Sequence, residues 1–279
     1  MNPNLQKRRI ALTYLALVPI VTAVLGFSVG HVSYKIYLPL WIINVCLMIV
    51  SAWVLGLHVT RGNDKEKTYL AKSAFSLIIP WILISMFAGL GPPPETPAGW
   101  VDSSTEQQVR YFVLVIAGVF IAYGFVGLRS LLKNKGDDFY SLVGTASILI
   151  AIPLFLINML FWGFYLTELF RIEVLSGAKN HPDWFTPVGK LFDLVSVVEV
   201  ALTYIATMVF AISLKKAKLF TPTPCLIYIS ISLLAFCIVI LSAFFSEPFV
   251  TAGYAVSIPA IPFVMPYLMG VNLLRRAGN

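Results

Sequence analysis

Charged side chains are scarce in this sequence. Aspartate, glutamate, lysine and arginine together make up 12% of the 279 residues, against about 25% in an average soluble domain. Hydrophobic residues make up 58% of the chain, and the mean hydropathy is +0.85. A composition this poor in charge and this rich in apolar residues excludes an ordinary soluble protein and predicts an integral membrane protein.

The sequence also lacks the motifs of several enzyme and cofactor classes. It contains no HExxH zinc motif, no glycine-rich phosphate loop, no paired-aspartate motif for prenyl diphosphates and no GxSxG nucleophile elbow. Every lysine lies at a span boundary or in a loop, which excludes a retinal Schiff base inside a helix. His31 and His58 lie near opposite membrane faces, so bis-histidine haem is not predicted. We expect no cofactor, and the residues favour a non-enzymatic protein without excluding enzymatic chemistry.

Cysteine is equally rare. Cys46, Cys225 and Cys237 each stand alone within an apolar segment. Single thiols of this kind are typical of packing residues, and their spacing indicates neither a disulfide nor a metal site. We therefore expect no bound metal.

Long apolar segments, in contrast, fill nearly the whole chain. A helix needs about 20 residues to cross about 30 Å of hydrocarbon, and eight segments are long enough. We predict an all-helical integral membrane protein with eight transmembrane helices, organised as one transmembrane domain over residues 1–279. The predicted spans are about 10–30, 37–58, 70–91, 111–131, 141–168, 190–214, 223–246 and 252–274.

The basic residues lie mainly on one side of these spans. Fifteen of the 20 lysines and arginines precede span one, separate spans two and three, or follow spans four, six and eight. The positive-inside rule therefore predicts cytoplasmic N- and C-termini, in a cell membrane of the bacterial inner-membrane type. Because topology accounts for the net charge of +7, the lipid bilayer is the predicted partner and no nucleic acid is expected.

One glutamate, Glu199, interrupts the sixth predicted span. An ionisable residue at this depth costs about 2.5–3.5 kcal/mol on insertion scales, and such residues commonly mark functional sites. Ser196, Thr203 and Thr207 fall on the same arc of the helix, and Asp193 lies beside them toward the predicted outer end. This polar stripe is predicted to face other helices or water.

Span five is the predicted neighbour of this stripe, because Asn158, Trp162 and Tyr165 recur at helical spacing and Glu168 follows one turn further out. Three carboxyls without a lysine would favour a cation, protons or a small polar ligand. In the alternative interpretation, Glu199 is a structural carboxyl bonded to a neighbouring helix. The predicted lining of an outward-facing pocket is Glu199, Asp193, Ser196, Thr203, Glu168, Asn158 and Tyr165.

Two further patterns bear on architecture. Pro259, Pro262 and Pro266 should bend or break span eight, because each removes a backbone donor. Spans two and six, aligned by their basic ends, place Asn44 opposite Glu199 and indicate a candidate 4+4 parallel pseudo-repeat, as in some transporters.

These features predict a small transporter or ion-coupled carrier with an outward-facing polar pocket around Glu199. The alternative is a non-catalytic membrane subunit or sensor, whose outer loops at about 91–108 and 171–188 bind a partner or lipid. Trp100 and Trp184 in these loops are predicted to anchor at the membrane interface. A lipid-acting enzyme is a third hypothesis, in which the same carboxyls would have to supply both acid and base.

Overall fold

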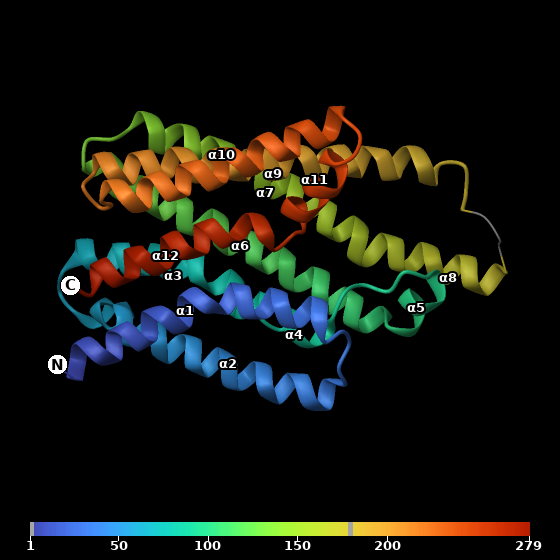
Figure 1. Ribbon diagram of the computed structural model, residues 1–279, viewed down its shortest axis with the longest axis horizontal. Helices are drawn as coiled ribbons and strands as arrows, with labels where there is room; N and C mark the ends of the chain where they lie inside the picture. The colour runs from blue at the N-terminus through green and yellow to red at the C-terminus, as the bar shows by residue number, and fades with distance from the viewer. Residues whose placement is uncertain (1–2, 178–180) are drawn as a thin grey trace.

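The structure is a computed structural model that describes residues 3–177 and 181–279 (Figure 1). Every regular element in these ranges is a helix, and none is a strand. Within the described residues, seven helices are long and apolar enough to cross a membrane, and counting one bent pair as a single span gives up to eight. The predicted all-helical membrane class is confirmed.

The membrane-crossing elements follow the order of the predicted spans. They are α1 (Pro3–Ser28), α2 (Tyr34–Leu55), α3 (Lys65–Ile84) continued by α4 (Phe87–Leu90), α6 (Ser104–Asn134), α7 (Phe139–Leu160) continued by η2 (Phe161–Tyr165) and α8 (Leu166–Ser176), α9 (Phe185–Lys216), α10 (Pro222–Phe244), and α11 (Phe249–Ser257) with η3 (Ile261–Phe263) and α12 (Val264–Ala277). Two short helices, η1 (Leu57–Arg61) and α5 (Pro97–Asp102), lie in the connections.

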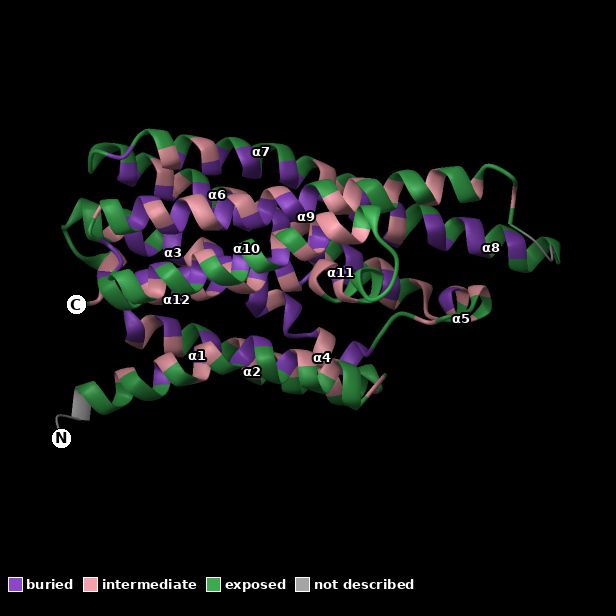
Figure 2. Cartoon of the chain, turned by 45° about the horizontal axis from the view of Figure 1, so that its top comes forward, coloured by how far each residue is buried: buried purple, intermediate pink, exposed green. Residues whose placement is uncertain are grey.

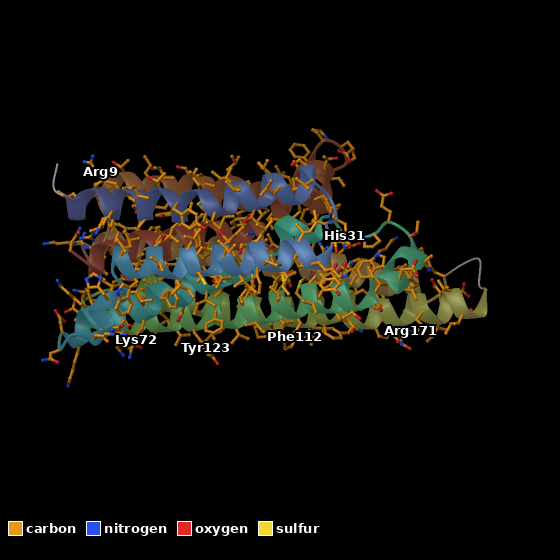
Figure 3. The ribbon with its side chains drawn as sticks, turned by 90° about the horizontal axis from the view of Figure 1, so that it is seen from below. Arg9, His31, Lys72, Phe112, Tyr123 and Arg171 are labelled. Atoms are coloured by element: carbon orange, nitrogen blue, oxygen red, sulfur yellow. The ribbon has the colours of Figure 1, made fainter. Side chains whose placement is uncertain are left out.

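Both chain termini lie at the same end of the bundle, beside the connections that follow α2, α6 and α9 (Figure 1). We call this end, which includes Arg9 and Lys72 (Figure 3), the basic end. The guanidinium group of Arg8 donates there to the carbonyl oxygens of Leu55 at 3.1 Å, Arg275 at 2.9 Å and Gly278 at 3.2 Å. One arginine therefore connects the ends of α1, α2 and α12.

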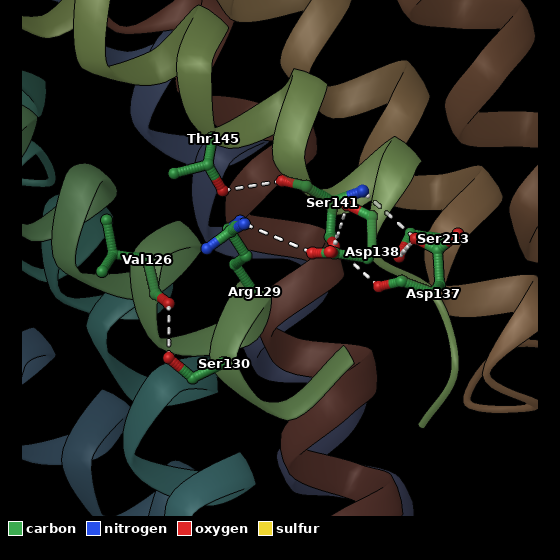
Figure 4. A network of polar contacts seen from close by, with 8 residues as sticks. All are labelled: Val126, Arg129, Ser130, Asp137, Asp138, Ser141, Thr145 and Ser213. Carbon is green, nitrogen blue, oxygen red and sulfur yellow. Dashed lines mark hydrogen bonds and ion pairs between the residues drawn. The ribbon is translucent and has the colours of Figure 1, made fainter. Parts of the chain in front are cut away.

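A second polar network at the basic end surrounds the buried carboxylate of Asp137 (Figure 4). This carboxylate accepts the backbone N–H of Ser141 at 3.1 Å and the hydroxyl of Ser213 at 2.6 Å. The ammonium of Lys216 lies 3.9 Å away, and Arg129 pairs with the neighbouring Asp138 at 3.3 Å. Because the bonded groups come from α7 and α9, Asp137 fixes these two helices to each other.

Buried residues concentrate on α3, α6, α7, α9 and α12, whereas α1, α2 and α10 lie at the periphery (Figure 2). Small residues allow the central helices to approach closely. A methyl group on Gly270 of α12 would lie 2.6 Å from the carbonyl oxygen of Ala74 on α3, and one on Gly124 of α6 would lie 2.4 Å from Leu77. Both glycines thus set the spacing of the core.

The two longest helices exceed what a bilayer requires. The continuous helix Phe139–Ser176 has 38 residues and α9 has 32, which correspond to about 57 Å and 48 Å. A whole bilayer, headgroups included, is about 40–45 Å thick. α8 and the first turns of α9 extend past the ends of α1 and α2 at the end opposite the basic end (Figure 1). Together with α5 they form a projection, residues 91–104, 166–177 and 181–195, that we call the cap.

The prediction of two long outer loops is wrong, because the cap is largely helical. Residues 91–96 are irregular, as their prolines require, but α5, α8 and the starts of α6 and α9 fill most of both segments. The cause is a small apolar core: the Trp100 ring lies 6.1 Å from Tyr111 and 5.7 Å from Phe170. Trp100 is buried, and its indole N–H donates to the carbonyl of Pro94, so its predicted role as an interfacial anchor is wrong.

The predicted break of span eight is confirmed, because α11 and the segment Ile261–Ala277 meet at 60°. Pro259 lies in the break, Pro262 is the second residue of the 3₁₀ turn and Pro266 lies in the first turn of α12. All three positions are ones where a missing backbone N–H is tolerated. The span therefore consists of two half-helices.

Candidate functional site

The site begins with one hydrogen bond between two membrane-crossing helices. The side-chain amide of Asn158 on α7 donates to Oε1 of Glu199 on α9 at 3.0 Å. Asn158 is 2% exposed and Glu199 is 3% exposed. The polar faces of the fifth and sixth spans therefore meet at this pair.

Each member of the pair retains an oxygen that receives no hydrogen bond. Oε2 of Glu199 and Oδ1 of Asn158 are both buried without a partner in the part of the chain that the structure describes. Both atoms are acceptors when the glutamate is ionised, so neither can satisfy the other. A proton on Glu199, a cation or a water molecule would supply the missing partner.

The pair lies far from the basic end. Glu199 precedes Lys216 by 17 residues on α9, which places it about 26 Å along the helix axis. The hydrocarbon layer is about 30 Å thick, so the pair lies in the half of the bundle nearer the cap.

The helix α11 contacts α9 near the pair. About one and a half turns from Glu199 toward the basic end, the Tyr204 hydroxyl donates to the carbonyl of Val256 at 2.8 Å. The last turn of α11 therefore packs beside α9 near the site.

The threonines of the polar stripe are buried, but they bond to their own helix. The Thr203 hydroxyl donates to the carbonyl of Glu199 at 2.8 Å, and the Thr207 hydroxyl donates to that of Thr203 at 2.9 Å. Such bonds satisfy a hydroxyl locally. Ser196 is half-buried. Thr203 thus supports the backbone of α9 at Glu199 and offers no free donor to the carboxylate.

The remaining predicted pocket residues lie at the surface. Glu168 pairs with Arg171 at 3.3 Å, and its side chain is 58% exposed. Asp193 and Tyr165 are also exposed. The structure therefore brings Asn158, Glu199 and Thr203 together, and it does not gather the three carboxyls that the sequence predicted in one pocket.

The reason is a change of helical pitch directly after Asn158. Residues Phe161–Tyr165 form the π-helical turn η2, whereas the sequence prediction assumed regular α-helical spacing. A wider turn rotates all later residues about the helix axis relative to Asn158. Tyr165 and Glu168 therefore do not share the helix face of Asn158. π-turns inside α-helices occur frequently at functional sites.

Aromatic rings cover the pair on the side of the cap. The rings of Phe161 and Phe192 stack 3.8 Å apart at an interplanar angle of 7°. Phe161 also packs on Tyr165 at 5.5 Å, and Tyr165 lies 5.9 Å from Trp184. Because Phe161 follows Asn158 by one turn and Phe192 precedes Glu199 by two, this aromatic stack lies on the cap side of the pair, and Phe192 and Trp184 belong to the cap itself.

Sequence reasoning assigned no role to Arg110, which is buried near the base of the cap. Its guanidinium group donates to the carbonyls of Gly91 at 2.8 Å and Leu90 at 3.2 Å, and it lies 5.6 Å from the Phe87 ring. Arg110 thus satisfies the free carbonyls that follow α4. A lone basic residue at the edge of an apolar segment is equally typical of the membrane interface, so the sequence contained no distinguishing signal.

Glu173 was also missed. Its side chain is 9% exposed and binds Nδ1 of His181 at 2.7 Å within the cap. A comparable pair, His31 with Glu106 at 2.8 Å, joins the α1–α2 connection to α6.

In the described ranges, no three His, Cys, Asp or Glu side chains are grouped as a metal centre would require. A cation at the Asn158 and Glu199 pair would find one carboxylate and one amide oxygen.

Fold and site together define a polytopic helical membrane protein with a carboxyl group buried between two of its spans. Comparison with protein-family models, with curated proteins and with solved structures gives no match for this chain.

Proposed function

We propose that the protein is a small membrane carrier in which Glu199 and Asn158 bind the proton or monovalent cation that drives transport. The observation that supports this proposal is the pair of buried acceptor oxygens without a donor. An unsatisfied polar group in a membrane interior costs several kcal/mol. The pair is therefore most stable when a proton or a cation occupies it.

Occupancy of such a pair can be linked to a change of conformation. A protonated Glu199 could donate to the free oxygen of Asn158, whereas the ionised form leaves two acceptors facing each other. Loss of the proton would weaken the contact between α7 and α9 and favour an arrangement in which water reaches the carboxylate. A carrier needs this coupling between the occupied site and the packing of its helices.

Irregular backbone near the pair gives the proposed motion a physical basis. The π-turn η2 begins three residues after Asn158 on α7, and the break between α11 and α12 lies close to the bond from Tyr204 to Val256. Broken helices at the level of an ion site are common in secondary transporters. The aromatic stack would act as the barrier on the cap side, which the distribution of basic residues predicts to be external.

A carboxyl-reactive, membrane-permeable carbodiimide tests the proposal without a known substrate, because it modifies protonated carboxyl groups in apolar surroundings. The intact protein in liposomes should acquire a mass label on the peptide that contains Glu199. Labelling should decrease as the pH rises, and sodium or lithium ions should slow it further if the site also binds cations. Glu199→Gln should abolish the label.

Glu168→Gln is the matched control, because Glu168 is an exposed carboxyl on the adjacent helix. This variant should retain the label on Glu199. If Glu199 in the folded protein does not react at any pH, or reacts to the same extent at every pH, it does not exchange a proton and the carrier proposal is wrong.

The cap favours a second candidate, a non-catalytic subunit that binds a protein partner. Leu175 is 81% exposed and Ile172 is 57% exposed on α8, near the end of a continuous helix of 38 residues that is longer than a bilayer is thick. Exposed apolar side chains in water often mark interaction surfaces. If this candidate is right, Leu175→Asp should disrupt binding of the protein partner, and Glu199→Gln should leave that binding unchanged.

A further inference from the structure

A crevice lies between the two N-terminal helices, α1 and α2. It has a volume of about 570 Å³ and lies over Ser85–Gly89 at the junction of α3 and α4. Pockets that bind small molecules have volumes of about 300–1,000 Å³. The crevice is thus large enough for a ligand, and it is separate from the Asn158 and Glu199 pair.

The walls of the crevice are aliphatic and incompletely covered by protein. Val21 and Leu25 of α1 are 49% and 41% exposed, and Leu40 of α2 is 62% exposed. Both helices are long and apolar enough to cross the membrane. The medium that reaches the crevice from the side is therefore the hydrocarbon of the bilayer, which would place a lipid chain against these walls.

Four of the polar side chains in the crevice are already hydrogen-bonded. Tyr14 donates its hydroxyl to Oδ1 of Asn44 at 2.5 Å, and the Asn44 amide donates to the hydroxyl of Ser85 at 2.9 Å. Ser85 in turn donates to the carbonyl of Ile82 at 2.8 Å, and so does the indole N–H of Trp41 at 3.1 Å. These bonds hold the walls in place, and most of the remaining lining residues are aliphatic. The occupant must be apolar along most of its length.

An exposed lysine, Lys35, lies beside the mouth of the crevice at the cap end. Residues 30–40 contain His31 and Lys35 and no acidic residue. His31 pairs with Glu106, whereas Lys35 is exposed and has no ion pair among the residues that the structure describes. The next two residues of α2, Ile36 and Tyr37, line the crevice. A lysine beside an apolar groove can pair with the phosphate of a lipid headgroup.

We propose that this crevice binds one anionic phospholipid, with an acyl chain between α1 and α2 and its phosphate at Lys35. The lipid would fill the space that the two peripheral helices leave open over the start of α4. It would thereby connect α1 and α2 to the rest of the bundle. The proposal does not depend on the function of Glu199.

Native mass spectrometry of the purified full-length protein tests the proposal directly. With phosphatidylglycerol and phosphatidylcholine added in equal amounts, the wild type should retain one lipid, with phosphatidylglycerol preferred. Ala88→Trp, which fills the crevice, should remove the bound lipid. Leu149→Trp is the matched control, because Leu149 is 55% exposed on α7, outside the crevice. This control should retain the lipid as the wild type does.

Lys35→Gln isolates the headgroup contact. It should leave one lipid bound and abolish the preference for phosphatidylglycerol. Retention of the lipid by a folded Ala88→Trp protein, or an unchanged preference in Lys35→Gln, would overturn the proposal.

A fluorescence measurement avoids any dependence on the folding of Ala88→Trp. Phosphatidylglycerol with brominated acyl chains should quench part of the tryptophan emission of the wild type. Trp41→Phe should remove that part, because Trp41 lines the crevice. Equal quenching of the two proteins would show that no acyl chain reaches Trp41 and would contradict the proposal.

Discussion

Asn158 on α7 donates its amide to Glu199 on α9 at 3.0 Å, and the remaining oxygen of each side chain is buried without a donor. This relationship makes the pair sensitive to small chemical changes. Removing one member leaves the other buried and unpaired, whereas an amide in place of the carboxyl adds a donor. The predictions for the site follow from this difference.

The first prediction compares two substitutions of Glu199. Glu199→Leu should destabilise the protein by about 1–3 kcal/mol, because it leaves the Asn158 amide buried without its acceptor. Glu199→Gln should cost less, since its carbonyl oxygen can still accept from Asn158. Thermal unfolding in detergent measures both effects. If Glu199→Leu and Glu199→Gln unfold at the same temperature, the bond to Asn158 does not stabilise the fold.

The second prediction concerns Asn158→Asp. Two carboxyl groups in one buried site cannot both ionise without strong repulsion. The folded variant should therefore bind a proton that the unfolded chain releases, and its stability should decrease as the pH rises. The matched control is Thr203→Val, which adds no charge to the site. A pH dependence of the melting temperature identical in Asn158→Asp, the control and the wild type would show that position 158 does not face Glu199.

The third prediction concerns the π-turn. A methyl group on Gly163 would lie 2.3 Å from Cβ of Tyr111, whereas one on Gly189 would meet nothing within 4 Å. Gly163→Ala should cost about 1–3 kcal/mol through overpacking. Gly189→Ala should be neutral or stabilising, because alanine is the better helix former. The difference in unfolding temperature between the two variants checks the close contact of α6 with η2.

Hydrophobic length made the spans predictable, because each apolar segment is long enough to cross the bilayer whatever it packs against. The contact between spans five and six was also predictable from the sequence, since Asn158 and Glu199 are polar residues within otherwise apolar helices. The π-turn was not predictable, because no residue in Phe161–Tyr165 distinguishes it from a regular helical turn; in the structure Gly163 of this turn packs on Tyr111. The cap was missed for a similar reason: a prolonged helix such as α8 is recognised only once its apolar partners are known.

The candidate 4+4 repeat stays a prediction, and the structure adds one relevant observation. Asn44, which aligns with Glu199, bonds to Tyr14 on the preceding helix, just as Glu199 bonds to Asn158 on the helix before it.

The positions of Asp193 and Glu168 could not be predicted from helical spacing, because polar residues near the end of a span can face solvent as easily as a pocket. Only the packing distinguishes these two outcomes.

The fourth prediction concerns Arg110. Arg110→Ala would leave the carbonyls of Leu90 and Gly91 without their donors and remove a buried side chain. Breaking one bond between a charged group and a buried carbonyl costs about 1.5–3 kcal/mol. The variant should unfold at a clearly lower temperature, whereas Arg171→Ala, which removes an exposed arginine, should change stability little. Equal stability of the two variants would mean that Arg110 does not hold α4 in place.

The last prediction concerns orientation. Both termini lie at the basic end, together with the connection that contains Lys135, whereas Gly177 lies in the cap at the opposite end. Because basic residues are retained on the cytoplasmic side during insertion, Lys135 should be cytoplasmic and Gly177 external. Reporter fusions that are active on only one side of the membrane should therefore give opposite results at these two positions. The same result at both would mean that the helix Phe139–Ser176 does not cross the membrane between these two positions, and the external placement of the cap would be wrong.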